Sequence, residues 1–167
     1  MVYVIKMEEE NISKKTISRD TPLSEITLRR YEKPNLKGRE LTRKLCLSIG
    51  LLQPGDSRDV VVDVLYVLLK EKKELNSEEI RDKVINLRKQ NSLPILGVAS
   101  SNIRRQLKRL RDIFLVEKII NNYRITENLT LNEVMEEKLE KFMIPAIMDR
   151  IKDYFNAVDE EFKIKKE

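Results

Sequence analysis

The sequence predicts a mainly α-helical protein that carries one small β-hairpin. Three observations predict this fold class. Apolar residues recur at helical spacing from about residue 37 onward, and helix-capping signals precede several of these segments. Glycine and proline number only 4 and 5 among 167 residues, so few positions interrupt a helix. Two short runs of β-forming residues, close together near residue 120, break the helical pattern once.

Residues 1–55 are predicted to be an N-terminal arm and helical extension. Val2–Met7 has the composition of a short strand, and a polar loop follows it. Within this loop Lys14, Lys15 and Arg19 are either a basic arm or an ordinary exposed segment. Thr21-Pro22 has the pattern of a helix start, so we expect a short helix toward Tyr31 that stops before Pro34.

A second helix is expected from Lys37 or Gly38 to Ile49, because Leu41, Leu45, Cys46 and Ile49 fall on one face. Gly50 is suited to end it. The turn Pro54-Gly55 then marks the clearest internal boundary, and Asp56 or Ser57 can cap the next helix.

The segment from Ser57 to about Lys72 is predicted to be a central core helix. Val61, Val64, Leu65, Leu68 and Leu69 are spaced to enter a core. Because the run VVVDVLYVLL is rich in β-branched residues, a buried strand is the alternative.

The next helix start is marked by a capping box of Asn76 with Glu79, and by a hydrophobic staple of Leu75 with Ile80. This helix should reach Lys89. A loop over residues 90–99 follows, after which Ser100 or Ser101 is expected to cap a helix to about Leu115.

A hairpin is predicted over residues 116–126, with Asn121-Asn122 as its two-residue turn, because asparagine tolerates the positive φ of tight turns. Thr130 and Glu133 form another capping box, with Leu129 and Val134 as its staple. They open a helical tail, residues 127–167, that is expected to bend or restart near Pro145.

The order helix, helix, helix, hairpin over residues 56–126 resembles the winged helix-turn-helix superfamily of transcriptional regulators. The resemblance is carried by the helices from Ser57 and Asn76, by SSNIRRQLKRLRDIFLVEKI and by NNYRIT as the wing. It implies that the third helix enters the major groove of DNA and that the wing touches flanking backbone or minor groove. The connector of about nine residues before the third helix is longer than is usual in that superfamily, and its SLPILGV run suggests an apolar brace.

A helical wheel assigns the two faces of the third helix. Ile103, Leu107, Leu110 and Phe114 form one narrow apolar stripe, expected to face the core. Polar and basic residues fall opposite it or on its flanks: Ser101, Asn102, Arg104, Arg105, Lys108, Arg109 and Arg111. Asp112 lies at the centre of this outer face.

These residue types are suited to nucleic acid. A guanidinium can bind guanine or a phosphate, so Asn102 and Arg105 are candidate base readers. We expect Arg104, Lys108, Arg109 and Arg111 chiefly to contact phosphates. In the wing, Lys118, Asn121, Asn122 and Arg124 can reach phosphates, although turn geometry alone explains the asparagines equally well.

The tail carries an apolar stripe of Ile147, Ile151, Tyr154, Val158 and Phe162 at helical spacing. Such a stripe either packs on the N-terminal helices of the same chain or pairs two chains. Because two-fold symmetry suits proteins that read palindromes, a homodimer is favoured.

Composition excludes several classes of function. With one cysteine and no histidine, the chain has no internal disulfide, no zinc-ligand cluster and no Ser-His or Cys-His pair. Cys46 is expected to be buried and inert. No catalytic, metal or cofactor motif is found, so an enzyme is the least favoured class. No apolar run is long enough for a membrane span and no signal peptide is recognised, so a cytoplasmic location is expected, nucleoid-associated if DNA is bound.

Charge agrees with a polyanionic partner. The net charge is +5, and the first 126 residues carry 26 basic against 17 acidic residues, whereas the rest carry 7 against 11. The composition, rich in Lys, Glu, Ile and Leu, is typical of thermophile and archaeal-like proteins. The predicted function is therefore transcription regulation by binding double-stranded DNA. The alternative is a winged-helix adaptor between proteins, and no effector site is predicted, since Tyr31, Tyr66 and Met143 are as well explained by a core.

Overall fold

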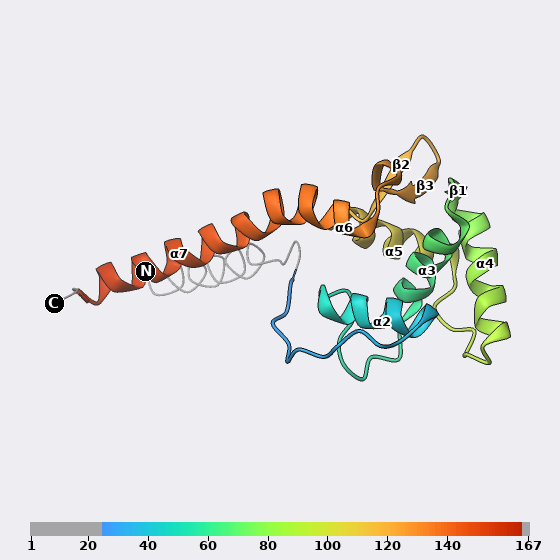
Figure 1. Ribbon diagram of the computed structural model, residues 1–167, viewed down its shortest axis with the longest axis horizontal. Coiled ribbons are helices and arrows are strands. Elements are labelled where there is room, and N and C mark those ends of the chain that lie inside the picture. The colour runs from blue at the N-terminus through green and yellow to red at the C-terminus, as the bar shows by residue number, and fades with distance from the viewer. Residues whose placement is uncertain (1–24, 165–167) are drawn as a thin grey trace, which may run out of the picture.

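The computed structural model describes residues 25–164, which are mainly helical with a small antiparallel sheet (Figure 1). In chain order the elements are α2 (Gly38–Ser48), α3 (Val60–Glu71), β1 (Leu75–Asn76), α4 (Ser77–Gln90), α5 (Ser100–Asp112), β2 (Val116–Ile119), β3 (Asn122–Ile125), a 3-10 turn η1 (Thr126–Asn128), α6 (Leu131–Val134), a π-helical stretch η2 (Met135–Met143) and α7 (Ile144–Glu161). The strand predicted at Val2–Met7 and the basic arm of Lys14, Lys15 and Arg19 lie outside the described residues.

The helix predicted from Thr21 to Tyr31 is wrong over residues 25–31, which are not helical. Tertiary contacts hold this segment against the end of α2 instead. Arg29 Nε donates to the Leu47 carbonyl oxygen at 2.9 Å. At Gly50 a Cβ atom would lie 1.8 Å from the Glu25 carbonyl oxygen, so the two backbones touch at a place where only glycine fits. Thr21–Ser24 lie outside the described residues.

The helix end predicted at Gly50 is confirmed. Gly50 adopts φ +76°, and the Leu51 amide donates back to the Cys46 carbonyl oxygen at 2.9 Å, as in a Schellman cap. This cap turns the chain so that Leu51 and Leu52 are buried beside Cys46.

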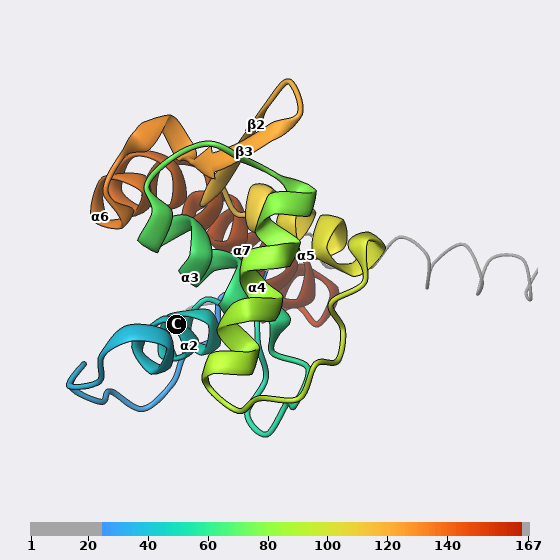
Figure 2. The same cartoon turned by 90° about the vertical axis from the view of Figure 1, so that its right-hand side faces the viewer.

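Helix α3 lies at the centre of the fold, in contact with α2, α4, α5 and β3 (Figures 1 and 2). The segment Val60–Glu71 is helical, so the alternative of a buried strand is excluded. The helix begins at Val60 rather than at Ser57. Its β-branched run tolerates the helix because Val60–Val62, Val64 and Leu65 are all buried by neighbours on several sides.

The start of α4 is tied to the hairpin. Asn76 caps α4 through the predicted capping box, in which its side chain accepts from the Glu79 amide at 2.9 Å. Leu75 and Asn76 also form a short strand that sequence periodicity did not predict, and this strand pairs with Tyr123 and Asn122 of β3. The resulting sheet has the order β1-β3-β2.

The hairpin is confirmed, but its turn lies one residue earlier than predicted. Ile119 pairs with Asn122, so the two turn residues are Ile120 and Asn121. Ile120 takes φ 57° and is 87% exposed, which is an unfavourable backbone conformation for a β-branched residue. The register is set by burial of Val116 and Tyr123, because a shift by one residue would expose both.

We expect Ile120→Asn to raise the free energy of unfolding by about 1 kcal/mol, because asparagine adopts positive φ at lower cost. Urea denaturation measures this change. Ile120→Ala is the matched control, since it removes the exposed side chain and leaves the backbone strain. A gain that is equal in both variants would mean that loss of apolar exposure, rather than relief of strain, is responsible.

Helix α5 ends at Asp112 rather than at Leu115, and it begins after Ala99 without a side-chain cap from Ser100 or Ser101. Phe114 therefore leaves the predicted apolar stripe: it takes φ 63° and is 38% exposed. The amides of Phe114 and Leu115 donate to the carbonyls of Arg111 and Leu110 at 3.0 Å, which closes the helix. Ile113 and Leu115 fill the core position expected for Phe114.

The C-terminal helix is a long arm that stands away from the rest of the fold (Figure 1). It opens with the predicted capping box of Thr130 and Glu133, and Val134 is fully buried below it. The helix changes from π to α type beside Pro145, in agreement with the predicted irregularity there. No residue of α7 is buried: Ile147 packs partly against the core, whereas the rest of the stripe, Ile151, Tyr154, Val158 and Phe162, is exposed and does not pack on any other helix among residues 25–164.

Candidate nucleic-acid interface

Helix α5 has one fully buried face, and this fixes what it presents to solvent. Ile103, Leu107 and Leu110 have no exposed surface and pack in the core beside α3. Opposite them the exposed residues of the candidate interface are Ser101, Arg104, Arg105, Lys108 and Arg111, together with Asp112. We call the four cations Arg104, Arg105, Lys108 and Arg111 the outer basic set.

The outer basic set is only weakly engaged within the chain. Within residues 25–164, the side chains of Arg105 and Arg111 make no hydrogen bond or ion pair. Arg104 lies 3.7 Å from Glu78, and Lys108 is 2.8 Å from Asp112 one turn later. Because both pairs are exposed, each contributes little to stability, and a phosphate can replace either carboxylate.

Two residues of the predicted set lie on the inner edge of α5. Arg109 Nη2 donates to the Leu51 carbonyl oxygen at 2.6 Å, and its Nη1 donates to Gln106. Asn102 donates to the Gly97 carbonyl oxygen at 2.5 Å and accepts from Gln106. These contacts fasten α5 to the segments before it, so the structure places Asn102 and Arg109 apart from the outer basic set.

The long connector between α4 and α5 is held by hydrogen bonds to its backbone. Arg88 Nε donates to the Pro94 carbonyl oxygen at 2.7 Å and Arg81 Nε to that of Val98 at 2.8 Å. The predicted apolar brace is only partly present, because Ile95 and Leu96 are exposed while Val98 packs against the core. The length of the connector therefore does not leave the start of α5 loose.

The anchor of this connector is a buried ionic network of Arg39, Asp59, Asp63 and Arg88. Asp63 is fully buried and Arg88 is 3% exposed. Arg39 Nε donates to Asp63 at 2.7 Å, and its Nη2 donates to Asp59 at 2.8 Å. Arg88 Nη1 donates to both carboxylates from the other side. Two carboxylates thus face two guanidiniums, and the network joins α2, α3 and α4.

Sequence reasoning missed this network, although a signal for it was present. Asp63 is the one acidic residue in the apolar run from Val60 to Leu69, and Asp59 precedes it by one helical turn. An acid in a helix that is apolar all round is buried, and a buried carboxylate needs basic partners. Arg39 and Arg88 are far from Asp63 in sequence, so the apolar pattern predicts that a basic partner exists but does not identify it.

The pKa of Asp59 reflects this environment. Burial raises the pKa of its carboxyl, but the hydrogen bonds and charges of Arg39 and Arg88 outweigh burial and hold it below the usual value. The pKa of Arg39 is raised in turn: its burial acts in the opposite direction, and the hydrogen bonds to Asp63 and Asp59 prevail. Asp59 and Arg39 are therefore both charged at neutral pH.

Acid should remove the contribution of Asp59 to stability. Since the pKa of Asp59 is lower in the folded than in the unfolded chain, its contribution is complete above the unfolded value of about 4 and is lost as pH falls through the folded value. We expect the difference in unfolding free energy between the native chain and Asp59→Asn to be constant above that region and to shrink below it. Urea denaturation at stepped pH measures it, and a difference that grows on acidification would contradict the assignment.

The hairpin offers a smaller basic contribution than predicted. Lys118 is exposed, with its ammonium 5.8 Å from the centre of the Tyr123 ring, and Asn121 is exposed at the turn. Asn122 pairs within the sheet, between Ile119 and Asn76. Arg124 is held by Glu117 at 2.7 Å and Glu74 at 3.1 Å. Lys118 and Asn121 therefore remain the hairpin side chains available to a phosphate.

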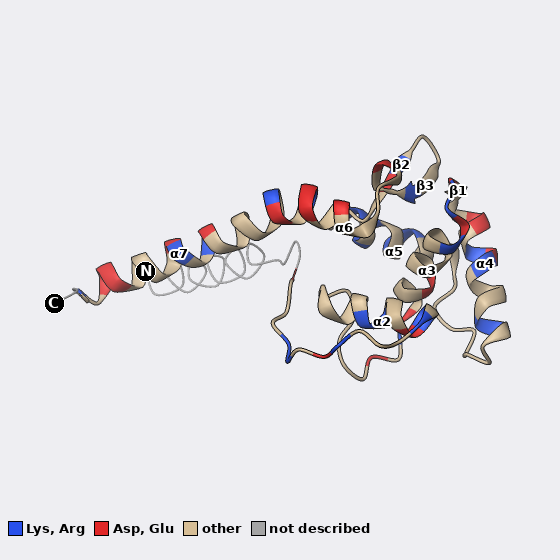
Figure 3. Cartoon of the chain, in the orientation of Figure 1, with Lys and Arg blue, Asp and Glu red and all other residues tan. Residues whose placement is uncertain are grey.

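Charge is unevenly distributed over the molecule (Figure 3). Helix α5 carries five basic residues against one acidic one, whereas α7 carries five acidic residues against two basic ones. The outer basic set thus lies on a helix whose net charge is opposite to that of the arm.

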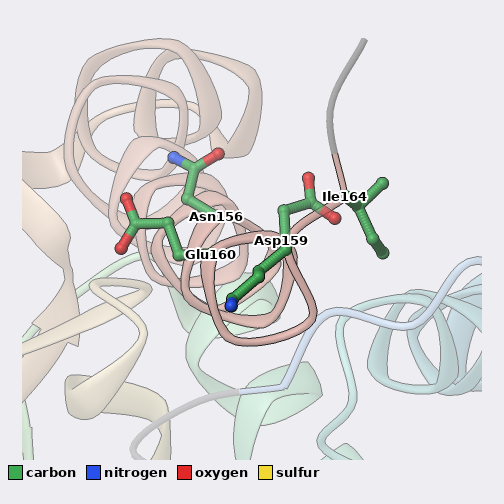
Figure 4. A pocket seen from close by; sticks show the side chains of 5 residues that line it. Asn156, Asp159, Glu160 and Ile164 are labelled. Atoms are coloured by element: carbon green, nitrogen blue, oxygen red, sulfur yellow. The ribbon is translucent and has the colours of Figure 1, made fainter.

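Other features of the described residues offer no reactive centre. Cys46 is buried, and burial is the main cause that raises the pKa of its thiol to about 12, as expected for an inert cysteine. Residues 25–164 contain no group of three or more potential metal ligands. A hollow at the end of α7 is lined by Asn156, Asp159, Glu160, Lys163 and Ile164, but these side chains diverge around one helix end (Figure 4).

Within the part of the chain that the structure describes, no helix has both the length and the apolar character needed to cross a membrane. A scan of family models gave no match, and searches of curated proteins and of solved structures gave none.

Proposed function

We propose that this chain is a winged helix-turn-helix protein that binds duplex DNA through the outward face of α5 and acts as a transcription regulator. The observation that carries the proposal is the outer basic set, four cations on the solvent face of one helix whose opposite face is fully buried. Such a helix presents a row of hydrogen-bond donors on one face, and an α-helix fits into the major groove of B-form DNA.

The surroundings of α5 support this use. Its inner edge is fastened by Arg109 and Asn102, and the buried ionic network holds the preceding connector. On the other side β2 follows directly after α5, and β3 pairs with β1 at the start of α4. Helices α4 and α5 and the hairpin therefore form one connected unit, which suits a wing that contacts the backbone next to the groove.

Roles within the unit follow from position. Arg105 and Ser101 lie near the start of α5, the end that usually approaches base edges, so Arg105 is the candidate for bidentate contact with guanine. Arg104, Lys108 and Arg111 extend along the helix and are assigned to phosphates, with Lys118 and Asn121 of the hairpin. Asn102 and Arg109 are assigned to positioning α5 rather than to contacting DNA.

Salt dependence tests the proposal. If Arg104, Lys108, Arg111 and Lys118 neutralise about four phosphates, log K should fall with log salt at a slope of about −3.6. Fluorescence anisotropy with a labelled duplex, titrated at several salt concentrations, measures this slope. A slope near zero would contradict binding through these side chains.

Selection from a random pool of duplexes at moderate salt then separates the candidate roles. Enrichment of a defined sequence is expected for a regulator. Salt-dependent binding without enrichment would indicate a sequence-neutral DNA-binding protein, and absence of binding at low salt would leave an acidic protein as the partner of α5.

A further inference from the structure

The arm α7 exposes an apolar stripe that no residue between 25 and 164 covers. Ile151, Tyr154, Phe155, Val158 and Phe162 lie within one side of the helix, and each is more than 40% exposed. Because most of the stability of a helix in a protein comes from packing of its amphipathic face, the arm gains stability from a surface to pack against. The stripe points to an interaction surface rather than to an ordinary solvated face.

A second open apolar surface lies at the base of the arm. Residues 27–36 and α2 enclose a groove of about 970 Å³, which Leu69 and Leu131 close at one edge. Leu28, Leu36 and Leu41 contribute apolar surface that remains exposed, and Leu28 is 99% exposed. Because Leu131 is the first residue of α6, the groove opens beside the helix that becomes the arm.

The groove and the arm carry opposite charge. The groove is lined by four basic side chains, Arg29, Arg30, Lys33 and Lys44, and by one acidic side chain, Glu32. The arm carries five acidic side chains against two basic ones. Asp159 and Glu161 lie about 80° to either side of Val158 and Phe162, at the two borders of the stripe. An apolar stripe bordered by acids thus matches an apolar groove bordered by bases.

We propose that the C-terminal half of α7 docks in this groove of a second copy of the chain, and that the exchange is reciprocal. The arm runs away from its own groove (Figure 1), and its 18 residues span about 27 Å. A two-fold axis across the middle of two antiparallel arms brings the tip of each arm to the base of the other. The result is a closed, isologous dimer, and it does not depend on the proposed binding of DNA.

Sedimentation equilibrium of the full chain tests this interaction. The native chain is expected to be a dimer at micromolar concentrations. Ile151→Asp with Val158→Asp places charge in the stripe and should weaken the dimer by at least about 100-fold. Asn156→Asp, which adds one negative charge on the outer side of α7, is the control and should leave the dissociation constant unchanged. A monomeric native chain, as expected if another segment of the same chain fills the groove, overturns the proposal.

The groove itself is tested by Leu36→Asp with Leu41→Asp. This pair should weaken the dimer to a similar degree, with helical content by circular dichroism unchanged. A dimer that persists in this variant but dissociates when the stripe is altered means that the arms pair only with each other, and it overturns docking in the groove.

Reversing the charges on the groove and on the arm tests whether the two surfaces are complementary. Arg30→Glu with Lys33→Glu, or Asp159→Arg with Glu161→Arg, should each weaken the dimer by about tenfold, and the combined fourfold variant should regain most of this loss. Additive weakening in the combined variant overturns the pairing of these groups.

Cross-linking identifies the occupant. A tagged chain with Phe162→Cys and an untagged chain with Leu36→Cys are mixed and oxidised, and the buried Cys46 does not compete. A disulfide between tagged and untagged chains is expected. If a chain that carries both cysteines forms only an intramolecular disulfide, the arm folds onto the groove of its own chain. This result overturns the exchange.

Discussion

Replacing Asp63 by alanine is expected to lower the free energy of unfolding by about 3–5 kcal/mol, the usual cost of removing one partner from a buried ion pair. Arg88 would then have Asp59 as its one remaining carboxylate partner, shared with Arg39, and at 3% exposure it could not reach water without displacing its neighbours. The Arg88 contact to the Pro94 carbonyl would be strained as the guanidinium moves, so the connector before α5 should loosen as well. Urea denaturation measures the loss, and hydrogen exchange of the connector amides measures the loosening.

Asp82→Ala is the matched control for this change. Asp82 lies on the outside of α4, 72% exposed and 3.9 Å from Arg81, so its loss should cost less than about 0.5 kcal/mol. If Asp63→Ala were as mild as this control, the network would be a consequence of the fold rather than one of its supports.

Local sequence patterns predicted the helix termini well where the capping residues lie within a few positions of the backbone groups that they bind. Asn76 with Glu79, Thr130 with Glu133 and Gly50 each satisfy backbone groups within a few residues, so their geometry can be derived from spacing alone. The exposed positions Arg104, Arg105 and Lys108 follow equally directly, because the buried stripe of α5 determines the opposite face.

The failures involve partners that are distant in sequence. The segment 25–31 has a helix start in front of it, but contacts with Leu47 and Gly50 hold it in another conformation. Arg109 lies on the polar side of the wheel, yet the Leu51 carbonyl is within its reach only after α2 and α5 have packed. Helix periodicity gives the position of each residue around the helix axis. It does not show which other segment of the chain packs against each side of the helix.

The predicted turn of the hairpin failed for a related reason. Asn121-Asn122 has the better turn chemistry, but the register is decided by Val116 and Tyr123, which must both reach the core. The energetic gain from burying these side chains exceeds the cost of placing Ile120 at positive φ, so the fold accepts a strained residue at the tip of the hairpin.

Combined replacement of Arg104, Arg105 and Lys108 by alanine is expected to weaken DNA binding by about 100-fold at physiological salt, because each of the two lost phosphate contacts removes about 0.7 log units there and the lost guanine contact removes at least as much. Loss of the two phosphate contacts should reduce the salt slope by about 1.8, from about −3.6 to about −1.8. Since the three side chains are exposed and alanine favours a helix, the unfolding free energy should change little.

Arg109→Ala is the informative control, because it removes a cation from the same helix. Arg109 is held by the Leu51 carbonyl and by Gln106, so its loss should reduce stability by leaving a buried acceptor unsatisfied, while the salt slope stays the same. Anisotropy titrations at four salt concentrations and urea denaturation of both variants provide the comparison. A slope that drops for Arg109→Ala and not for the triple variant would place the nucleic acid on the inner edge of α5, against the interface proposed for its outer face.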